Sequence, residues 1–526
     1  MKRLLVFATT FVLFFVLLGV FLDHTRLFIL GAIIFILTLA AYDFMQKKHS
    51  ILRNFPAIGR LRFLFELIRP EIQQYFIATE EEERPFSREQ RSIVYARAKK
   101  ELDTIPFGTK HDITDEGYES ALHSLKPTHI SEIESRVRVG GADCQQPYHA
   151  SRLNISAMSF GAISKNAVLA LNKGAKYGNF AHNTGEGGLS PYHLAGGGDI
   201  IWQLGTANFG ARTKDGKLDP DLFQKKSQHA QVKMIEIKIS QGAKPSHGGI
   251  LPAVKITPEI AEIRNIPLGE DCMSPPTNPE FDTPEELLQF VTKLRQLSGG
   301  KPIGFKLSIG KKEQFLGICK AMLKTNVLPD FITVDGAEGG TGAAPLEFTN
   351  RLGLTIDEAL TFVHNSLVGC GLREKITVIA SGKIITGFDM LCKIALGADI
   401  LNSARGMMFA VGCIQSLQCN KNTCPTGVAT QNPYLMRGLD VESKYMRVAN
   451  FHDATIKSFL EIAGAMGFKH IDNISPWDVF RRGQNDQNRS LAEIYPQLKH
   501  KAFIEDIENL PKDFAYHWTQ ASAEHF

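Results

Sequence analysis

The sequence predicts an α/β protein built on a (β/α)8 TIM barrel, with a two-helix transmembrane hairpin before it and helical flanking segments. From Ser151 onward, short apolar runs rich in valine and isoleucine alternate with amphipathic helical patterns, as in parallel sheets and barrels. The alternation continues for about 270 residues, the usual size of an eight-stranded β/α barrel. We assign a hairpin to 1–45, a helical or irregular lead-in that packs on the barrel to 46–150, the barrel to 151–435 and a helical extension to 436–526.

The amino terminus contains two apolar stretches. The first, 4–22, carries no charge and is long enough to span a bilayer, and the second runs from 27 to 42. Basic residues precede the first stretch and follow the second, so we expect both ends on the cytoplasmic side. A cleaved signal peptide is the alternative, but the second stretch has no role in one. The expected location is the cytoplasmic membrane, with the barrel facing the cytoplasm.

Composition limits the partners of this chain. Its 526 residues are 44% hydrophobic and 22% charged, as in globular proteins. The net charge of +4 is too small to imply nucleic-acid binding, and the basic residues near the apolar stretches suit lipid head groups better. We therefore expect a membrane partner and no nucleic acid.

Several strands and helices of the barrel can be read directly. A strand at 153–158 precedes a helix at 163–176, and Thr283, followed by Pro284 and Glu286, starts another helix with a capping box. Gly299 and Gly300 end that helix. Further strands are expected at 302–307, 331–334, 377–380 and 399–402, with a helix at 388–396.

Five glycine-rich stretches follow expected strand ends, at 183–188, 241–249, 335–342, 381–387 and 403–406. Glycine in a tight turn explains any one of them, but in a barrel all five loops would open on the face where ligands bind. The last two occupy the positions at which barrels bind phosphate, with the residues Ser381, Gly382, Ala404, Arg405 and Gly406.

The ligand expected at this phosphate site is flavin mononucleotide (FMN). Neither a GxGxxG fingerprint nor a GxxxxGK[ST] loop occurs in the chain, which argues against a nicotinamide nucleotide or a nucleoside triphosphate. Lys306 points inward from a predicted strand. It is either an ion-paired core lysine or a cation that stabilises the negative charge of a reduced flavin.

Cys413, Cys419 and Cys424 form one short run, with five and four residues between them. Such a group indicates a disulfide, a structural zinc or an iron–sulfur cluster. A cytoplasmic location makes a persistent disulfide unfavourable, so the run remains a candidate site for zinc or for a cluster.

The motifs from Ser156 to Pro433 resemble the flavin and iron–sulfur synthase domain of glutamate synthase, in order and in spacing. They are SAMSFGAIS, NTGEGG, QGAKP with the following HGG, SPP, DGAEGGTGAAP, SGKIITGFD and the cysteine run that ends in CPTGVATQNP. The resemblance covers a little over half of the chain directly, and the cysteine spacing with CPxGVATQ is its most specific part. Leu189 and Ser190 depart from the pattern, because the family often has acidic residues there.

The resemblance implies a set of cofactors. The barrel would bind FMN, and Cys413, Cys419 and Cys424 would hold a 3Fe-4S cluster beside it. The implied FMN-binding residues are Ser156, Ala157, Met158, Asn183, Lys306, Gly339, Gly340, Thr341, Ser381, Gly382, Lys383, Ala404 and Arg405.

The resemblance also implies a reaction, in which ammonia adds to 2-oxoglutarate and the resulting 2-iminoglutarate is reduced to L-glutamate. Gln241 and Lys244 would then bind the carboxylates of the oxoacid, and Glu186 would assist ammonia addition and proton transfer. No amidotransferase or nicotinamide motif is recognised, so we expect ammonia from outside the chain and electrons from a ferredoxin or a flavoprotein. The alternatives are a membrane-bound FMN and iron–sulfur dehydrogenase or electron carrier acting on another amine or oxoacid, and a non-catalytic scaffold.

Overall fold

The computed structural model describes residue 14, residues 25–484 and residues 487–526, and it divides into two compact units, Met1–Glu89 and Gln90–Phe526. The first predicted membrane helix, 4–22, lies outside the described residues except for Phe14. The second corresponds to helix α2 (Thr25–Met45), which contains the stretch Phe28–Met45 with a mean hydropathy of 2.2. By length and composition α2 is able to cross a membrane, and the hairpin as a whole stays a prediction.

The rest of the first unit is helical. Two helices, α3 (Ser50–Asn54) and α4 (Arg60–Ile72), follow α2, and α4 continues as a π-helical turn over Gln73–Ile77. The boundary between the two units falls inside the segment 46–150 that was predicted to be one lead-in.

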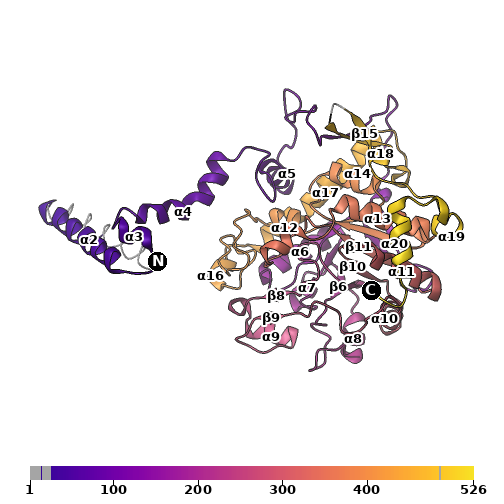
Figure 1. Ribbon diagram of the computed structural model, residues 1–526, viewed down its shortest axis with the longest axis horizontal. Helices are drawn as coiled ribbons and strands as arrows, with labels where there is room; N and C mark the ends of the chain where they lie inside the picture. Colours follow the sequence, from indigo (N-terminus) through magenta and orange to yellow (C-terminus); the bar gives the residue numbers. More distant parts are fainter. Residues whose placement is uncertain (1–13, 15–24, 485–486) are drawn as a thin grey trace. The chain divides into compact units, whose positions relative to one another are not determined.

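The second unit contains a closed barrel of eight parallel strands, which confirms the predicted fold class (Figure 1). Its strands are β4 (Leu153–Ile155), β5 (Ala181–Asn183), β6 (Asp199–Leu204), β7 (Val232–Lys238), β10 (Ile303–Leu307), β11 (Phe331–Asp335), β12 (Thr377–Ser381) and β13 (Ile400–Ser403). Strand β13 pairs with β4, with Asn402 opposite Asn154, and this pairing closes the barrel.

Helices on the outside connect successive strands, as expected for this fold. They are α6 (Lys165–Gly178), α7 (Pro191–Ala195), α8 (Pro220–Ser227), α10 (Pro284–Leu297), α11 (Lys312–Thr325), α12 (Leu346–Arg351), α13 (Ile356–Gly369) and α14 (Gly387–Ala395). Half of the predicted capping box of α10 is found, because Thr283 Oγ1 accepts a hydrogen bond from the Glu286 amide at 3.1 Å. The Glu286 carboxylate accepts from the Asp282 amide at 2.7 Å rather than from Thr283. Helix α6 starts two residues later than predicted, since the Ser164 side chain caps it.

A hairpin of β2 (Arg136–Val139) and β3 (Tyr148–Ser151) closes the amino-terminal end of the barrel. Val139, Tyr148 and Ala150 pack in one buried cluster with residues near the starts of the barrel strands, among them Ala181 and Phe331. Apolar side chains therefore fill this end, which leaves the carboxyl-terminal end for ligands.

The connection between β7 and β10 is long and carries its own small elements. These are a hairpin of β8 (Ile250–Leu251) and β9 (Cys272–Met273), a 3-10 turn at Ala253–Lys255 and helix α9 (Pro258–Arg264). The hairpin strands are antiparallel, with Ile250 opposite Met273.

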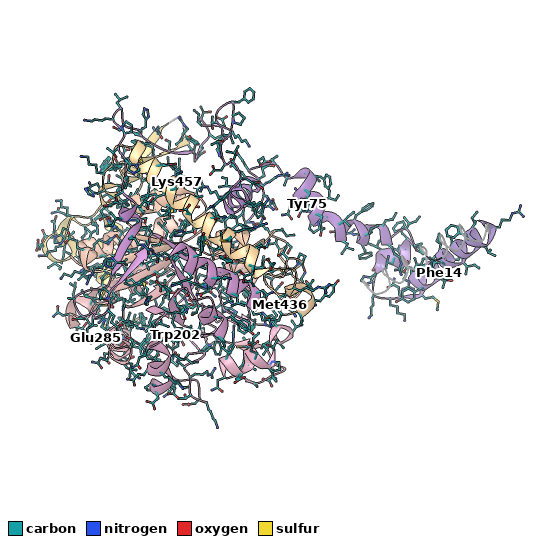
Figure 2. All side chains as sticks on the ribbon, turned by 180° about the vertical axis from the view of Figure 1, so that it is seen from behind. Phe14, Tyr75, Trp202, Glu285, Met436 and Lys457 are labelled. Carbon is teal, nitrogen blue, oxygen red and sulfur yellow. The ribbon has the colours of Figure 1, made fainter. Side chains whose placement is uncertain are left out.

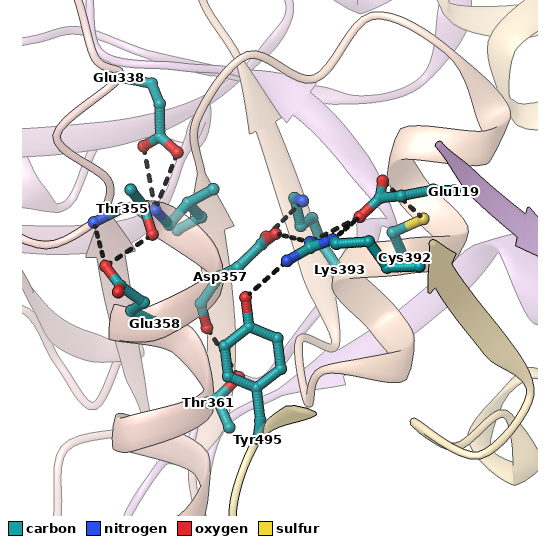
Figure 3. A network of polar contacts seen from close by, with 11 residues as sticks. Glu119, Glu338, Thr355, Asp357, Glu358, Thr361, Cys392, Lys393 and Tyr495 are labelled. Atoms are coloured by element: carbon teal, nitrogen blue, oxygen red, sulfur yellow. Dashed lines mark hydrogen bonds and ion pairs between the residues drawn. The ribbon is translucent and has the colours of Figure 1, made fainter. Parts of the chain in front are cut away.

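After the barrel the chain forms α15 (Arg405–Ala410), α16 (Pro433–Met436), the long helix α17 (Val441–Ala465), α18 (Leu491–Ile494), α19 (Ala502–Glu505) and α20 (Lys512–Gln520). It also adds two strands, β14 (Val479–Arg482) and β15 (Asn488–Ser490), and β14 pairs with β15 on one side and with β1 (Glu119–Ala121) on the other. A polar network ties this sheet to the barrel helices (Figure 3). Arg481 bonds Glu119 on β1 at 2.6 Å and Asp357 on α13 at 2.7 Å, and Asp357 also pairs with Lys393 on α14. The lead-in and the carboxyl-terminal segment therefore support the same side of the barrel.

Candidate active site

The loops after β4 and β12 meet at the carboxyl-terminal end of the barrel. Ser156 Oγ lies 3.3 Å from Ser381 Oγ, and both side chains are buried. The Ser156 amide donates to the Ser403 carbonyl at the end of β13, so the two strand ends predicted to bind phosphate lie together with the end of β4. Of the other predicted residues on these loops, Met158 and Gly382 are buried, and Ala157, Lys383 and Ala404 are partly exposed.

The loop after β11 lies against Arg405. Gly339 is partly exposed and Gly340 and Thr341 are exposed, and Arg405 Nη2 donates to the Glu338 carbonyl at 2.6 Å. A Cβ on Gly340 would come within 3.0 Å of the guanidinium group, so this glycine permits the close approach. Burial lowers the pKa of Arg405 to about 10, and Asp335 and Glu338 counteract the effect.

Lys306 points into the barrel from β10, as predicted. Its ammonium group lies 3.8 Å from Asp335 Oδ2, a separation longer than a hydrogen bond. The same Asp335 oxygen accepts a hydrogen bond from the Gly242 amide at 2.9 Å. Lys306 is thus an ion-paired core lysine whose ammonium keeps its hydrogen-bond donors for a ligand.

Asn183 belongs to a buried polar cluster that the sequence reasoning missed. Its side-chain amide donates to Glu236 on β7 at 2.8 Å, and Glu236 also accepts from Gln203 at 2.6 Å and from Thr333 at 2.6 Å. Three donors therefore satisfy one buried carboxylate inside the barrel. The cluster fixes Asn183, whose side-chain oxygen accepts from the Gly185 amide at 3.0 Å.

Glu186 pairs with a second residue that the sequence reasoning missed, Lys238 at the end of β7. Lys238 Nζ lies 2.7 Å from Glu186 Oε2, and the two side chains are 6% and 20% exposed. Glycines make room for the carboxylate, since a Cβ on Gly249 would lie 2.4 Å from Glu186 Oε1 and one on Gly205 would lie 2.6 Å from Glu186 Cβ. The sequence could have indicated that Lys238 points into the barrel, because Met234 faces the barrel core and every second residue of a strand shares a face.

The charges around Glu186 set its protonation. Burial alone would raise the pKa of this carboxyl, but Lys238 and then Arg264 and Lys244 hold the pKa below its usual range. Lys244 is 1% exposed, and burial lowers its pKa to about 8, with Glu186 opposing and Lys238 reinforcing that shift. The site therefore holds a carboxylate beside a lysine that titrates near neutral pH.

A cleft opens next to this group. It has a volume of about 230 Å³ including its mouth, and its lining includes Lys238, Gln241, His247, Gly249 and Pro275. The buried Gln241 Nε2 has no hydrogen-bond partner among the described residues, and a buried amide of this kind needs a partner. Of the predicted catalytic residues, Gln241 lines the cleft and Glu186 contacts two residues of its lining, Lys238 and Gly249. Lys244 interacts electrostatically with Glu186.

Arg264, at the end of α9, is a further cation at the site that the sequence reasoning missed. It is buried and donates from Nη2 to Ser159 Oγ at 3.3 Å and to the Phe160 carbonyl at 3.0 Å. Its charge contributes to the lowered pKa of Glu186. No local pattern in the sequence reveals this residue, because α9 lies in the long connection between β7 and β10.

The residues at the mouth fit the phosphate and ring system of FMN. The buried hydroxyl groups of Ser156 and Ser381 lie together. Arg405 places a guanidinium group against the glycine loop after β11, and the Lys306 ammonium group makes no hydrogen bond among the described residues. These groups match an anionic phosphate and a ring that carries negative charge when reduced.

The cysteine run follows α15. Cys424 is buried, and Cys413 and Cys419 are partly exposed. Burial raises the pKa of the Cys413 thiol to about 12, and the neighbouring Cys419 and Cys424 add to the effect, so the three thiols lie close enough to interact. Tyr95 Oη donates to the Cys413 carbonyl at 2.7 Å and holds the start of the run.

The spacing of the sulfur atoms bears on the choice between zinc and a cluster. Among the described residues, the three cysteines do not form a group whose ligand atoms all lie within 4.8 Å of one another. A zinc ion binds sulfur at about 2.3 Å, which places its ligands about 3.8 Å apart. The structure does not by this spacing assign a metal to the run, and the choice between zinc and a cluster stays a prediction.

A buried lysine lies under the cysteine loop. Lys255 donates to the carbonyls of Ala162, Cys419 and Ala429, the second at 3.2 Å and the third at 3.4 Å. Burial lowers its pKa to about 8, while Cys419 and Cys424 oppose that shift. Lys255 therefore connects the cysteine loop to the loop after β4 and places a cation near the sulfurs.

Comparison with known proteins agrees with this geometry. Residues 117–469 match the family model described as the conserved region in glutamate synthase. A glutamate synthase large subunit-like protein of Bacillus subtilis, YerD, is 38% identical in an alignment of 515 residues that covers 90% of this chain and 98% of that one. The archaeal glutamate synthase (NADPH) of Methanocaldococcus jannaschii is 35% identical over 64% of this chain and 62% of its own length. The chain belongs to the glutamate synthase family and is a glutamate synthase-like oxidoreductase.

Proposed function

We propose that the chain reduces 2-iminoglutarate, formed from 2-oxoglutarate and ammonia, to L-glutamate. The observation that carries this proposal is the buried group at the barrel mouth, in which the Glu186 carboxylate lies 2.7 Å from Lys238 beside Lys244, Arg264 and the unpaired Gln241 amide. Cations, an amide donor and a carboxylate base are the groups that amination of a dicarboxylic oxoacid needs.

Charge balance supports a dianionic substrate. Lys238, Lys244 and Arg264 all act on Glu186, so the group holds three cations against one carboxylate. 2-Oxoglutarate carries two negative charges at neutral pH and would neutralise the remainder. Lysine and arginine bind carboxylates through charge-assisted hydrogen bonds, and the Gln241 amide adds a donor.

Glu186 would act as the general base. Its Oε2 accepts from Lys238, which leaves Oε1, next to Gly249, to face the substrate. Because neighbouring cations lower its pKa, the carboxylate is ionised at neutral pH and able to take a proton from the nitrogen that adds to the oxoacid.

The cofactors follow from the residues that fit them. FMN, when bound, would supply the hydride that converts the imine to the amine. Ser156, Ser381 and Arg405 would hold its phosphate end, and Lys306 would lie near its ring. Cys413, Cys419 and Cys424 would hold a 3Fe-4S cluster that receives electrons from a ferredoxin or a flavoprotein, and ammonia would come from outside the chain.

Purified protein tests the proposal. We expect a flavin absorption spectrum, and L-glutamate after addition of 2-oxoglutarate, ammonium and dithionite, with formation lost in Glu186→Gln. Bound flavin that dithionite reduces without any glutamate formation would instead favour a dehydrogenase or electron carrier for another amine or oxoacid. A protein that binds no flavin would refute both functions.

A further inference from the structure

The first unit presents an apolar helical face that is exposed in the described part of the chain. Helix α4 has no buried residue, and six of its apolar side chains are 37% to 60% exposed. Leu67 borders the other five, which are Leu61, Leu64, Phe65, Ile68 and Ile72. At 3.6 residues per turn they occupy one arc of about 100°, the width of an amphipathic face. Arg62, Glu66 and Arg69 lie together on one flank of this face, about 40–100° farther round the helix than Phe65.

The apolar face continues past α4. Tyr75 and Phe76, in the π-helical turn, are 51% and 81% exposed, and Tyr75 is labelled in Figure 2. Contiguous exposed apolar surface of this extent marks an interaction site. Aromatic side chains beside leucine and isoleucine are typical of helices that lie in a membrane interface.

The end of α2 fixes where this face begins. Arg60, the first residue of α4, bonds the fully buried Asp43 carboxylate near the end of α2 through Nη2 at 2.5 Å and Nε at 2.8 Å. The Ala57 amide donates to the same carboxylate at 3.2 Å. Because α2 is apolar enough to span a bilayer and only 6% buried, α4 starts where the chain would leave the hydrocarbon region.

The charge of this segment suits an anionic surface. Residues 46–77 contain six Lys and Arg side chains against two Glu side chains. Each such cation near an anionic bilayer contributes about 1 kcal/mol to binding. Lys47, Lys48 and Arg53 precede α4 and are exposed, and Arg62 and Arg69 occupy its polar face.

We propose that α4 lies in the head-group region of an anionic lipid bilayer, with its apolar face on the acyl chains and its arginines toward the lipid phosphates. The helix would then act as a second membrane contact beside α2. The proposal concerns the first unit alone and does not depend on glutamate formation.

Tryptophan placed on either face of α4 tests the proposal in the full-length protein. Phe65→Trp lies on the apolar face, Arg62→Trp lies on the polar face as the matched control, and both retain the three native tryptophans. The proteins are reconstituted into phosphatidylcholine vesicles that contain phosphatidylglycerol, with or without acyl-chain-brominated lipid. We expect brominated lipid to remove about half of the added Phe65→Trp emission and almost none of the Arg62→Trp emission, because an interfacial helix buries one face about 5–10 Å deep.

Three outcomes would overturn the proposal. Equal quenching of the two variants would mean that α4 crosses the bilayer or stays outside it. If the emission of Phe65→Trp were blue-shifted but not quenched by brominated lipid, protein rather than lipid would cover the face. If that blue shift also depended on protein concentration in detergent, the covering protein would be a second copy of this chain. Quenching that is the same in pure phosphatidylcholine would remove the role assigned to the arginines.

Discussion

The ion pair between Lys238 and Glu186 gives the most direct test of the proposed chemistry. Lys238→Met removes the ammonium group 2.7 Å from the carboxylate and keeps most of the side-chain length. A neighbouring cation lowers a carboxyl pKa by about 1–3 units, and burial in the absence of that cation raises it. Lys244 and Arg264 remain in the variant and still favour the carboxylate, so we expect the pKa of Glu186 to rise by no more than this general range.

The pH dependence of glutamate formation measures this shift. If Glu186 works as the ionised base, the rate falls on the acidic side as its carboxylate becomes protonated. In Lys238→Met this acidic limb of kcat/KM for 2-oxoglutarate should move to higher pH by the same amount. Rates are compared at equal concentrations of free ammonia, because the fraction of unprotonated ammonia itself changes with pH. Lys238→Arg should restore most of the original limb.

Lys301 provides the matched control for the loss of a buried lysine. It donates to the carbonyls of Ser227 and Val232, each at 2.6 Å, and precedes β10 at the opposite end of the barrel. Lys301→Met should lower the stability of the protein without moving the acidic limb. An unchanged limb in Lys238→Met, or an equal shift in Lys301→Met, would show that this ion pair does not set the protonation of Glu186.

Three further outcomes are expected. Lys244→Gln should raise KM for 2-oxoglutarate about 10- to 100-fold, since one charge-assisted hydrogen bond contributes about 1.5–3 kcal/mol. The native protein should lose kcat/KM above about pH 8, where Lys244 loses its proton, and this decline should be absent from the pH profile of the variant. Cys419→Ser should remove iron from the purified protein, whereas Cys319→Ser, in the buried core of α11, should retain it, and unchanged iron content would contradict the ligand assignment. Glu236→Leu leaves three buried donors without an acceptor and should lower the free energy of unfolding by about 3–5 kcal/mol in a denaturant titration.

The barrel was predictable where local signals are strong. Apolar strands such as β11 and β12 and the Thr283 cap of α10 can be read from neighbouring residues alone. The strand β5 has no such signal, because Ala181–Asn183 is three residues long and contains a histidine and an asparagine. The sheet of β1, β14 and β15 depends on pairing between distant segments, with Glu119 opposite Arg481, which local patterns do not report.

The site was predictable only in part, for a related reason. The glycine loops and the motif residues Glu186, Gln241 and Lys244 are visible in the sequence, but their partners come from elsewhere in the chain. Arg264 reaches the site from α9 through the fold of a long connection. The alternation of side chains along β7 places Lys238 on its inward face. The residue was still missed, because a charged residue near a strand end is more often solvent-exposed.

The cost of burying charge helps to explain what the barrel mouth is for. Buried ion pairs such as Lys238 with Glu186 contribute little net stability, and apolar residues of similar volume would often serve the fold as well. Burial lowers the pKa of Lys244 although Glu186 opposes the shift, so this one carboxylate does not offset the cost of burying the ammonium group. A dianionic ligand would supply the missing negative charge, raise that pKa and recover part of the electrostatic cost. If the proposed function is correct, the site gives up stability in the free protein for affinity toward a dicarboxylate, as expected of a group selected for binding rather than for folding.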